Sequence, residues 1–260
     1  MHILVTNDDG VSTPGLLALA NAMRSLGDVS VLAPDRNWSG GGHVKTMDRP
    51  LRARAVRLAD GTAAWSSDGA PSDCVALALM GFLPPMTATK VDLVVSGINP
   101  TANLGHDVTY SGTVTAAMEA VIGDVPGIAF SLDSPMDGVA ELDFTAAAGV
   151  ARHVVQVALQ NGIPTGILLN VNVPYLPADQ IKGYYITRQG LRVYRNRLDK
   201  RQDPRGRPYY WIAGDAPTGI PEYGTDVGAL SDGFVSITPL QLDLTAYPAM
   251  QALGRWTFDL

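Results

Sequence analysis

Short hydrophobic runs alternate with longer amphipathic segments from the start of the chain to about residue 170. The short runs are apolar on both faces, which is typical of parallel strands covered by helices. In the longer segments, apolar residues recur three or four positions apart, which is the spacing of one helix face. This alternation predicts an α/β fold, a three-layer α/β/α Rossmann-like core with a mainly parallel sheet. The expected strands are 2–6, 29–33, 92–96, 127–132 and 166–171, and the expected helices are 14–26, 71–82, 112–121 and 144–159.

Local signals mark several of the helix ends. Ser12 or Thr13 can cap the first helix, because a side-chain oxygen at that position accepts a free backbone N–H. Pro14 fits the first helical position, where no N–H is needed, and Gly27 is expected to end the helix. Ser111 can cap the third helix in the same way as Ser12 or Thr13.

The chain changes character near residue 185. Tyrosine and arginine alternate along 184–197, a turn-like Asp-Pro-Arg-Gly segment follows at 203–206, and 208–212 is again aromatic and apolar. This pattern predicts a projecting β-hairpin. We expect one domain over 1–260, which consists of a core at about 1–185 and a hairpin and tail extension at about 186–260, with a strand at 233–238 and a short helix at 247–253.

The composition is that of an ordinary folded protein. Apolar residues make up 46% of the chain and charged residues 17%, which suits a packed core. No hydrophobic run approaches the roughly 20 residues that cross a bilayer. The first run stops at the polar segment Thr6-Asn7-Asp8-Asp9, too early for a signal-peptide core. We therefore expect a cytoplasmic protein with no membrane partner.

Cysteine and histidine are too scarce for most metal centres. Cys74 is the only cysteine, which excludes disulfides within the chain and multi-cysteine zinc or iron–sulfur sites. We expect Cys74 to be buried in a helix rather than to act as a nucleophile. The four histidines do not form the HExxH pattern of zinc helices. Any metal is therefore expected to have hard oxygen ligands.

The formal charge of −6 is unevenly distributed. Residues 182–207 hold nine of the 19 basic residues and only two acidic ones, so this segment carries +7 and the remainder −13. Such a basic hairpin offers an alternative function, a nucleotide- or RNA-binding regulatory module. Charge clusters on hairpins more often face solvent or another subunit, so nucleic acid is the less favoured partner.

Polar residues follow several of the expected strands. Ligands of open parallel sheets bind beyond the carboxyl ends of the strands. Asp8 and Asp9 follow the first strand, Ser39 lies in a Gly-rich loop after the second, and Asn99 follows the strand at 92–96. Two carboxylates, a hydroxyl and an amide oxygen form a ligand set suited to Mg²⁺, Mn²⁺ or Ca²⁺. A phosphoacceptor signalling domain also has an acidic pair after its first strand, but it needs an aspartate at the end of a middle strand, where this chain has Ser39 and Asn99.

The predicted helix start at Ser111-Gly112-Thr113 is a candidate phosphate site. Free N–H groups and the positive end of the helix dipole favour an anion there. Taken singly, these features have ordinary explanations, a serine N-cap here and a turn-capping aspartate at Asp8 or Asp9. Two carboxylates ~4 Å apart repel by roughly 4 kcal/mol at an effective dielectric near 20, and a divalent cation would remove this cost. Together the loops predict metal-assisted phosphoryl chemistry.

Several ordered segments match a known pattern along nearly the whole chain. They are Met1-His2-Ile3-Leu4-Val5-Thr6-Asn7-Asp8-Asp9-Gly10, Ala33-Pro34-Asp35-Arg36-Asn37 with Ser39-Gly40, Ser96-Gly97-Ile98-Asn99, Tyr110-Ser111-Gly112-Thr113-Val114, Asn170-Val171-Asn172-Val173-Pro174, and Gly224-Thr225-Asp226 followed by Gly233-Phe234-Val235-Ser236-Ile237-Thr238-Pro239-Leu240. A chain with these segments resembles the SurE family of stationary-phase survival proteins, which are metal-dependent nucleotidases.

The resemblance implies an activity and site residues. It implies a 5′-nucleotidase (EC 3.1.3.5 type) that hydrolyses nucleoside 5′- and 3′-monophosphates by a metal-activated water without a covalent intermediate, with exopolyphosphatase side activity. It also implies a homodimer or homotetramer formed through the C-terminal segment. By resemblance, one Mg²⁺ or Mn²⁺ per subunit, which Ca²⁺ can replace, is held by Asp8, Asp9, Ser39 and Asn99, and Asp8 and Asp9 are catalytic. The residues assigned to phosphate and substrate are Asn7, Gly40, Asn103, Ser111, Gly112 and Thr113.

Two segments depart from the family pattern. After Ser39-Gly40 the chain continues Gly41-Gly42-His43-Val44-Lys45, where the family has small polar residues, so no base or sugar contact is transferred to this loop. In Asn103-Leu104-Gly105-His106-Asp107, His106 replaces the first residue of an acidic pair. We expect His106 to be a surface residue.

Overall fold

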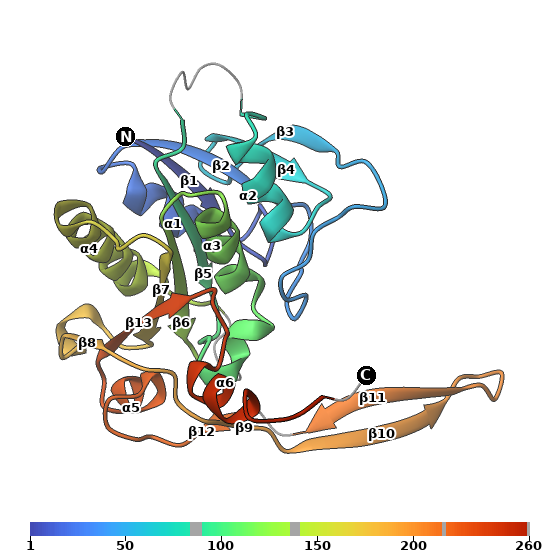
Figure 1. Ribbon diagram of the computed structural model, residues 1–260. Helices are drawn as coiled ribbons and strands as arrows, with labels where there is room; N and C mark the ends of the chain where they lie inside the picture. Colours follow the sequence, from blue (N-terminus) through green and yellow to red (C-terminus); the bar gives the residue numbers. More distant parts are fainter. Residues whose placement is uncertain (84–89, 136–140, 215–216, 259–260) are drawn as a thin grey trace.

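The computed structural model describes residues 1–83, 90–135, 141–214 and 217–258. A nine-stranded sheet has helices on both faces, and a two-stranded hairpin projects from this body (Figure 1). The expected α/β fold with a mainly parallel sheet is confirmed. In their order across the sheet, the strands are β3 (Ala53–Arg57), β4 (Ala63–Ser67), β2 (Asp28–Pro34), β1 (His2–Thr6), β5 (Leu93–Asn99), β6 (Gly127–Asp133), β7 (Ile167–Pro174), β13 (Val235–Gln241) and β8 (Tyr184–Ile186).

The centre of the sheet is parallel and its margins are mixed. β1 pairs in parallel with β2 and β5, and β5, β6 and β7 continue in the same direction. β3 runs antiparallel to β4, and β13 runs antiparallel to β7. In the register of β1 and β5, Thr6 lies opposite Ser96, so the loops after these two strands leave the same edge side by side.

Two pairs of helices cover the two faces of the sheet (Figure 1). On β1, Ile3 packs in one cluster with Leu16, whereas the next residue, Leu4, packs in the other cluster with Cys74. Alternate side chains of a strand point to opposite faces, so burial on both sides explains why the strand is apolar throughout. Within the described ranges, no helix is long and apolar enough to cross a membrane. The helices are α1 (Pro14–Met23) and α4 (Thr145–Asn161) on one face, and α2 (Pro71–Leu79) and α3 (Gly112–Ile122) on the other.

The first helix differs from the prediction at both ends. Thr13 occupies the N-cap position and Pro14 the first helical position, but the Thr13 hydroxyl donates to the Gly10 carbonyl oxygen (2.9 Å) instead of capping the helix. The helix ends at Met23, before Gly27. A Cβ at Gly27 would lie 2.6 Å from the Met1 carbonyl oxygen. Gly27 is therefore needed for close approach to the start of β1, and it does not end the helix.

The second helix is shorter than expected. α2 ends at Leu79, and the chain turns through Gly81, which has a φ of +91°. Phe82 lies outside the helix, where its ring packs edge-on against Trp65 with centroids 5.0 Å apart. Its apolar character therefore reflects this tertiary contact rather than a further helical turn. For α3 the prediction is confirmed, because the Ser111 hydroxyl accepts the backbone N–H of Val114 at 3.1 Å.

The expected end of the core near residue 185 is wrong. β13 inserts between β7 and β8, with Ser236 opposite Asn172, so the main sheet includes residues from the tail. Pairing between strands so far apart leaves no local signal in the sequence. The other unforeseen elements are β3, β4, β8, η1 (Gly105–Thr109), η2 (Ala178–Gln180), β9 (Arg192–Val193), β12 (Thr218–Gly219) and α5 (Asp226–Ser231).

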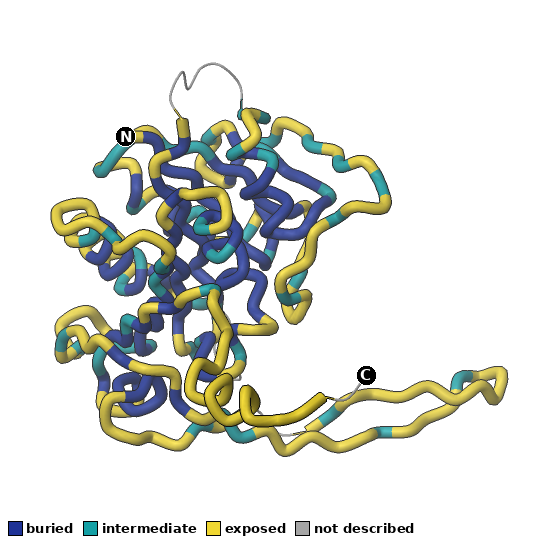
Figure 2. The backbone as a smooth tube through the Cα atoms, in the orientation of Figure 1, coloured by how far each residue is buried: buried dark blue, intermediate teal, exposed yellow. Residues whose placement is uncertain are grey.

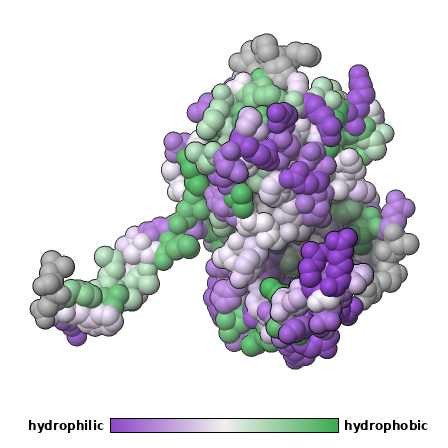
Figure 3. All heavy atoms as spheres, turned by 90° about the vertical axis from the view of Figure 1, so that its right-hand side faces the viewer, coloured by the Kyte–Doolittle hydropathy of each residue, from purple (hydrophilic) through white to green (hydrophobic). Residues whose placement is uncertain are grey.

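The expected hairpin begins later than residue 184, because β8 joins the main sheet and β9 pairs with β12. The projecting part, which we call the arm, consists of β10 (Asn196–Gln202) and β11 (Pro208–Gly214). It stands away from the body, and nearly all of it is exposed (Figure 2). Trp211 is 62% and Ile212 85% exposed. The expected short helix α6 (Tyr247–Leu253) contains no buried residue. Hydrophobic surface is also visible on a segment that projects from the body in Figure 3.

Candidate active site

The loop after β1 is shaped by its own side chains. The Asn7 amide donates from Nδ2 to the Gly10 carbonyl oxygen (3.1 Å) and to the Thr13 hydroxyl (2.8 Å), and its Oδ1 accepts the Gly10 N–H (3.2 Å). Gly10 has a φ of +111°, a conformation that favours glycine. The buried Asn7 thus holds the turn that presents the next two residues, Asp8 and Asp9.

Asp8 is buried against the start of α3. Its side chain accepts a hydrogen bond from the Thr113 hydroxyl. A Cβ at Gly112 would lie 2.6 Å from the Asp8 Cβ, so only glycine leaves room for this approach. Burial raises the pKa of Asp8, and hydrogen bonds from the Thr113 hydroxyl and from N–H groups of Gly112 and Thr113 offset part of this effect.

Asp9 follows Asp8 in the chain, and the two carboxylates repel each other. Burial, together with the repulsion from Asp8, raises the pKa of Asp9 to about 7. Both carboxylates are thus held where full ionisation costs free energy. A divalent cation would offset this cost, because it favours the charged form of both groups.

Ser39 and Asn99 complete the predicted ligand set. The Trp38 N–H donates to the Asp8 carbonyl oxygen at 2.7 Å, which holds the backbone next to the exposed Ser39 against the backbone of Asp8. The Asn99 amide donates to the Thr101 carbonyl oxygen (2.5 Å), and among the described residues nothing donates to its Oδ1. Two carboxylates, a hydroxyl and a free amide oxygen fit a hard cation.

This donor set is needed because carboxylates alone do not suffice. Over the described part of the chain, no cluster of three or more His, Cys, Asp or Glu side chains could hold a metal. A metal at Asp8 and Asp9 would therefore depend on the neutral oxygens of Ser39 and Asn99.

The remaining predicted phosphate groups lie at the same edge of the sheet. Gly42 donates its N–H to the Tyr110 carbonyl oxygen (3.0 Å), which joins the Gly-rich loop to the residue before Ser111. Gly40 has a φ of +76° and no neighbour within 4 Å of an added Cβ, so its backbone is open to a ligand. The Ser111 hydroxyl oxygen accepts the Val114 N–H, which leaves its own proton available to a phosphate, whereas the Thr113 hydroxyl donates to Asp8. The backbone N–H groups and the Ser111 hydroxyl are therefore better candidates for phosphate contacts than the Thr113 hydroxyl.

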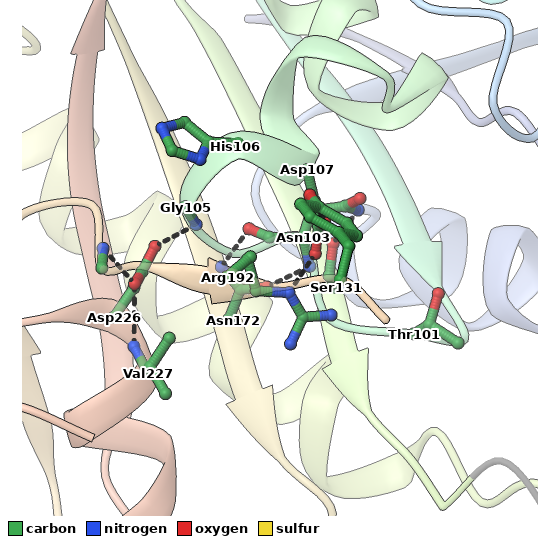
Figure 4. Close-up of polar contacts among 12 residues, drawn as sticks. Thr101, Asn103, Gly105, His106, Asp107, Ser131, Asn172, Arg192, Asp226 and Val227 are labelled. Carbon is green, nitrogen blue, oxygen red and sulfur yellow. Dashed lines mark hydrogen bonds and ion pairs between the residues drawn. The ribbon is translucent and has the colours of Figure 1, made fainter. Parts of the chain in front are cut away.

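Asn103 lies at the ends of β6 and β7 (Figure 4). Its N–H donates to Asn172 Oδ1 (2.8 Å), and its side-chain amide donates to the Ser131 hydroxyl (2.8 Å). Its carbonyl oxygen accepts the Asn170 amide (2.8 Å). These contacts fix the loop between Asn99 and Ser111, and the assignment of Asn103 to substrate remains a prediction.

Residues from the C-terminal part support the same loop, and the sequence did not indicate their role. The fully buried Asp226 accepts the N–H groups of Gly105 (2.8 Å) and Gly190 (2.7 Å) (Figure 4). Arg192 Nε lies 2.6 Å from Asp107 Oδ2. Asp226 belongs to a segment that matches the family. No local sequence pattern, however, indicates that its carboxylate is buried and accepts N–H groups from two distant loops.

Other singled-out residues lie outside this site. Cys74 is buried in α2, and burial raises the pKa of its thiol far above the ordinary value, so it is a structural residue as expected. His106 is exposed, as expected. His43, for which the sequence indicated no role, lies 2.9 Å from the Glu119 carboxylate.

Comparisons with known proteins cover nearly the whole chain. The family described as "Survival protein SurE" matches residues 3–196. The chain is 49% identical over 259 residues to a protein of Chloroflexus aggregans named 5′-nucleotidase SurE, with all of both chains covered. It is 52% identical over 255 residues to the protein of that name from Herpetosiphon aurantiacus, and the match covers 98% of this chain and 97% of that protein. It is similar to the crystal structure of the SurE protein from Aquifex aeolicus, with a TM-score of 0.80 and 44% identity. The match covers 97% of this chain and 98% of that structure.

Proposed function

The chain belongs to the SurE family of survival proteins, and from this premise we propose that it is a 5′-nucleotidase, which hydrolyses nucleoside 5′-monophosphates to nucleoside and phosphate. The observation that carries the proposal is the pair formed by the partly buried Asp9 and the buried Asp8, which packs against the first turn of α3. Phosphomonoester hydrolysis needs a group that activates water and a positive environment for the phosphoryl oxygens. The acidic pair and the helix N-terminus supply these two functions.

The finer substrate range follows from the same chemistry. The reacting groups address the phosphate rather than the nucleoside, so the same site also accepts nucleoside 3′-monophosphates. A terminal phosphate of polyphosphate presents the same oxygens, and an exopolyphosphatase side activity is part of the proposal. The relatives named above support the 5′ activity by their names alone.

One divalent ion per subunit, Mg²⁺ or Mn²⁺, fits the oxygens of Asp8, Asp9, Ser39 and Asn99, and Ca²⁺ can occupy the same set. When bound, such an ion neutralises phosphoryl charge and lowers the pKa of a water molecule. Asp8 is held by Thr113, so Asp9 is the freer carboxylate to orient the attacking water and accept its proton. N–H groups at the start of α3 stabilise the phosphoryl oxygens as charge develops.

No covalent intermediate is required. The water oxygen forms a bond to phosphorus and gives its proton to Asp9, while the bond from phosphorus to the nucleoside oxygen breaks. The departing oxygen takes up a proton from solvent, and Asp9 returns its proton to solvent. The site geometry also explains why Asn7 matters, since it holds the turn that presents both carboxylates.

A regulatory RNA-binding role for the basic hairpin is the alternative. Four of its nine basic residues form ion pairs within the subunit, and these are Arg188, Arg192, Arg201 and Arg207. Paired cations release fewer counterions on binding nucleic acid, so this arrangement favours the nucleotidase. We also propose that the C-terminal segment joins subunits into a dimer or tetramer.

The test is phosphate release from a panel of nucleoside 5′- and 3′-monophosphates and polyphosphate with Mn²⁺, Mg²⁺ or chelator. Asp9→Asn should lower metal-dependent turnover at least about a hundredfold, or roughly 2.7 kcal/mol of transition-state stabilisation. Asp232→Asn, at an exposed aspartate, is the matched control. Equal turnover with chelator, or none with any metal, would contradict the proposal. Salt-dependent oligonucleotide binding lost on replacing Arg195 and Arg197 would then favour the alternative.

A further inference from the structure

The Gly-rich loop after Ser39 is the least regular part of the site. Residues 38–46 contain no helix or strand, and Gly40 and Gly42 have positive φ values of +76° and +62°. Glycine loses more conformational freedom on ordering than any other residue. A loop of this composition therefore needs external contacts to keep Ser39 in one place.

Glu119, on α3, makes two of these contacts. It is buried, with a relative exposure of 5%, and its carboxylate faces the loop. Oε2 lies 2.9 Å from His43 Nε2, and Oε1 lies 2.5 Å from Lys45 Nζ. Burial disfavours its charge, but the contacts with His43 and Lys45 outweigh burial and lower the pKa of Glu119. A buried carboxylate with a polar partner on each oxygen, one of them the Lys45 ammonium, is a strong anchor, because leaving it unpaired is costly.

Backbone contacts fix the loop at further points. The Thr115 hydroxyl donates to the Gly42 carbonyl oxygen (3.2 Å), and the Gly42 N–H donates to the Tyr110 carbonyl oxygen (3.0 Å). On the other side, the Trp38 N–H donates to the Asp8 carbonyl oxygen (2.7 Å). Ser39 and Gly40 thus lie between one anchor at Asp8 and a second set of anchors on or next to α3.

The helix α3 connects the two sets of contacts. Its first turn contacts Asp8 through Thr113, and Glu119 follows six residues later, ~9 Å along a helix that rises about 1.5 Å per residue. A single rigid element therefore sets the position of the loop relative to the acidic pair. Movement of the loop away from Glu119 would move Ser39 away from Asp8 and Asp9.

We propose that Glu119 is a positioning residue, which holds His43 and Lys45 and thereby keeps Ser39 in place beside Asp8 and Asp9. The inference rests on the proposed function for the role of Ser39, whereas the anchoring of the loop stands on the contacts alone. It also gives a role to His43 and Lys45, which lie in the segment where this chain departs from its family.

The first experiment measures Mn²⁺ binding directly, by calorimetric titration of the metal-free protein. Glu119→Gln keeps the shape of the side chain and removes its charge, and it should weaken Mn²⁺ binding about tenfold. The Mn²⁺ concentration for half-maximal phosphate release from a nucleoside monophosphate should rise by the same factor, while kcat at saturating Mn²⁺ falls less than about threefold. Arg24→Met, which breaks an exposed ion pair with Asp60, is the control and should change neither quantity.

Hydrogen exchange gives a readout that does not depend on activity. Peptides covering residues 39–46 should exchange at least about tenfold faster in Glu119→Gln, whereas peptides from β1 should not change. If Glu119→Gln does not fold, the double variant His43→Asn with Lys45→Met tests the same contacts, because it replaces the two partners of Glu119, which are more exposed than Glu119 itself.

The outcomes separate this inference from the proposed function. Unchanged Mn²⁺ binding and unchanged exchange in these variants would overturn the positioning role. A wild type that binds Mn²⁺ but releases no phosphate would overturn the proposed function, while faster exchange and weaker Mn²⁺ binding in Glu119→Gln would still support the anchor.

Discussion

At the scale of single residues, Asp8 and Asp9 show how function can oppose stability. Both carboxylates are held close together in a site that burial makes unfavourable for charge. The protein thus tolerates a repulsion that a different pair of side chains would avoid, which is common where a cation or substrate later supplies the missing charge. The metal-free protein should therefore be least stable where both groups are ionised.

This cost predicts a pH dependence for the metal-free protein. The pKa of Asp9 is about 7 in the folded state against an ordinary 3.8, so the folded state binds more protons between these values. Its contribution to stability is present below the ordinary pKa and is lost as pH rises through about 7. Asp9→Asn should remove this loss and raise the free energy of unfolding at pH 8 by ~2 kcal/mol, less than the full shift implies because solvent screens the site.

The measurement is urea unfolding of both proteins in chelator at pH 4 and pH 8. The gain should be much smaller at pH 4, close to the ordinary pKa of 3.8, because little of the Asp9 contribution has been lost there. Added Mn²⁺ should raise the stability of the wild type at pH 8 and have little effect on Asp9→Asn. Equal effects of the substitution at the two pH values would show that Asp9 is not held in a charge-disfavouring site.

At the scale of elements, α3 is the part of the fold on which the site depends most. Its N-terminus contacts Asp8, its cap Ser111 follows the loop from Asn99, and Glu119 holds the Gly-rich loop. The loop before it is in turn held by Asp226 and Arg192 from the C-terminal part of the chain. The position of one helix therefore sets the geometry of three loops.

Two glycines in helices provide a matched test of this dependence. Gly112→Ala would place a Cβ 2.6 Å from the Asp8 Cβ, so Asp8 must move. We expect turnover of nucleoside monophosphates to fall about a hundredfold, because displacements near 1 Å at a reacting group have effects of that order. Gly149→Ala, in α4, meets nothing within 4 Å. It should leave turnover unchanged and stabilise the protein by ~0.5–1 kcal/mol through helix propensity.

Steady-state kinetics of the two variants measure the change in turnover, and thermal unfolding measures the change in stability. If Gly112→Ala retained wild-type turnover, then the contact between α3 and Asp8 would not be important for activity. If Gly149→Ala lowered turnover as well, the effect would reflect general sensitivity to helix substitutions.

At the scale of the whole molecule, the arm and α6 are not explained by a single subunit. The arm presents large apolar side chains to solvent, and α6 buries none of its residues within the subunit. Contiguous exposed apolar surface of this kind marks a contact with another chain. The proposed dimer or tetramer would cover it, and the ion pairs of the arm would remain at the rim.

Charge substitutions on the arm test this assembly. Trp211→Asp and Ile212→Asp should lower the mass measured by light scattering from a multiple of 27.5 kDa toward that of one chain, because an unpaired charge in an apolar contact is costly. Met80→Asp, at an exposed methionine near the end of α2, should leave the mass unchanged. A wild type that is monomeric at high concentration would contradict the proposed assembly.

The local pattern of the sequence determined the layered core and the identity of the candidate site. Burial on both faces makes a strand apolar throughout, as in β1, and this signal is visible without any tertiary information. Asp8, Ser39 and Asn99 could be grouped because successive parallel strands share one carboxyl edge. Their geometry relative to a metal remains a prediction.

The tertiary structure alone decided the parts that depend on contacts between distant residues. β13 enters the sheet beside β7, and Phe82 packs on Trp65. Gly27 must be glycine because a Cβ there would collide with the Met1 carbonyl oxygen. The anchors Asp226 and Glu119 are ordinary acidic residues in the sequence, and they acquire a role only where folding buries them beside specific partners. Periodicity records which face of an element is buried, but it does not record which distant groups lie opposite that face, because such pairing is set by the packing of the whole chain.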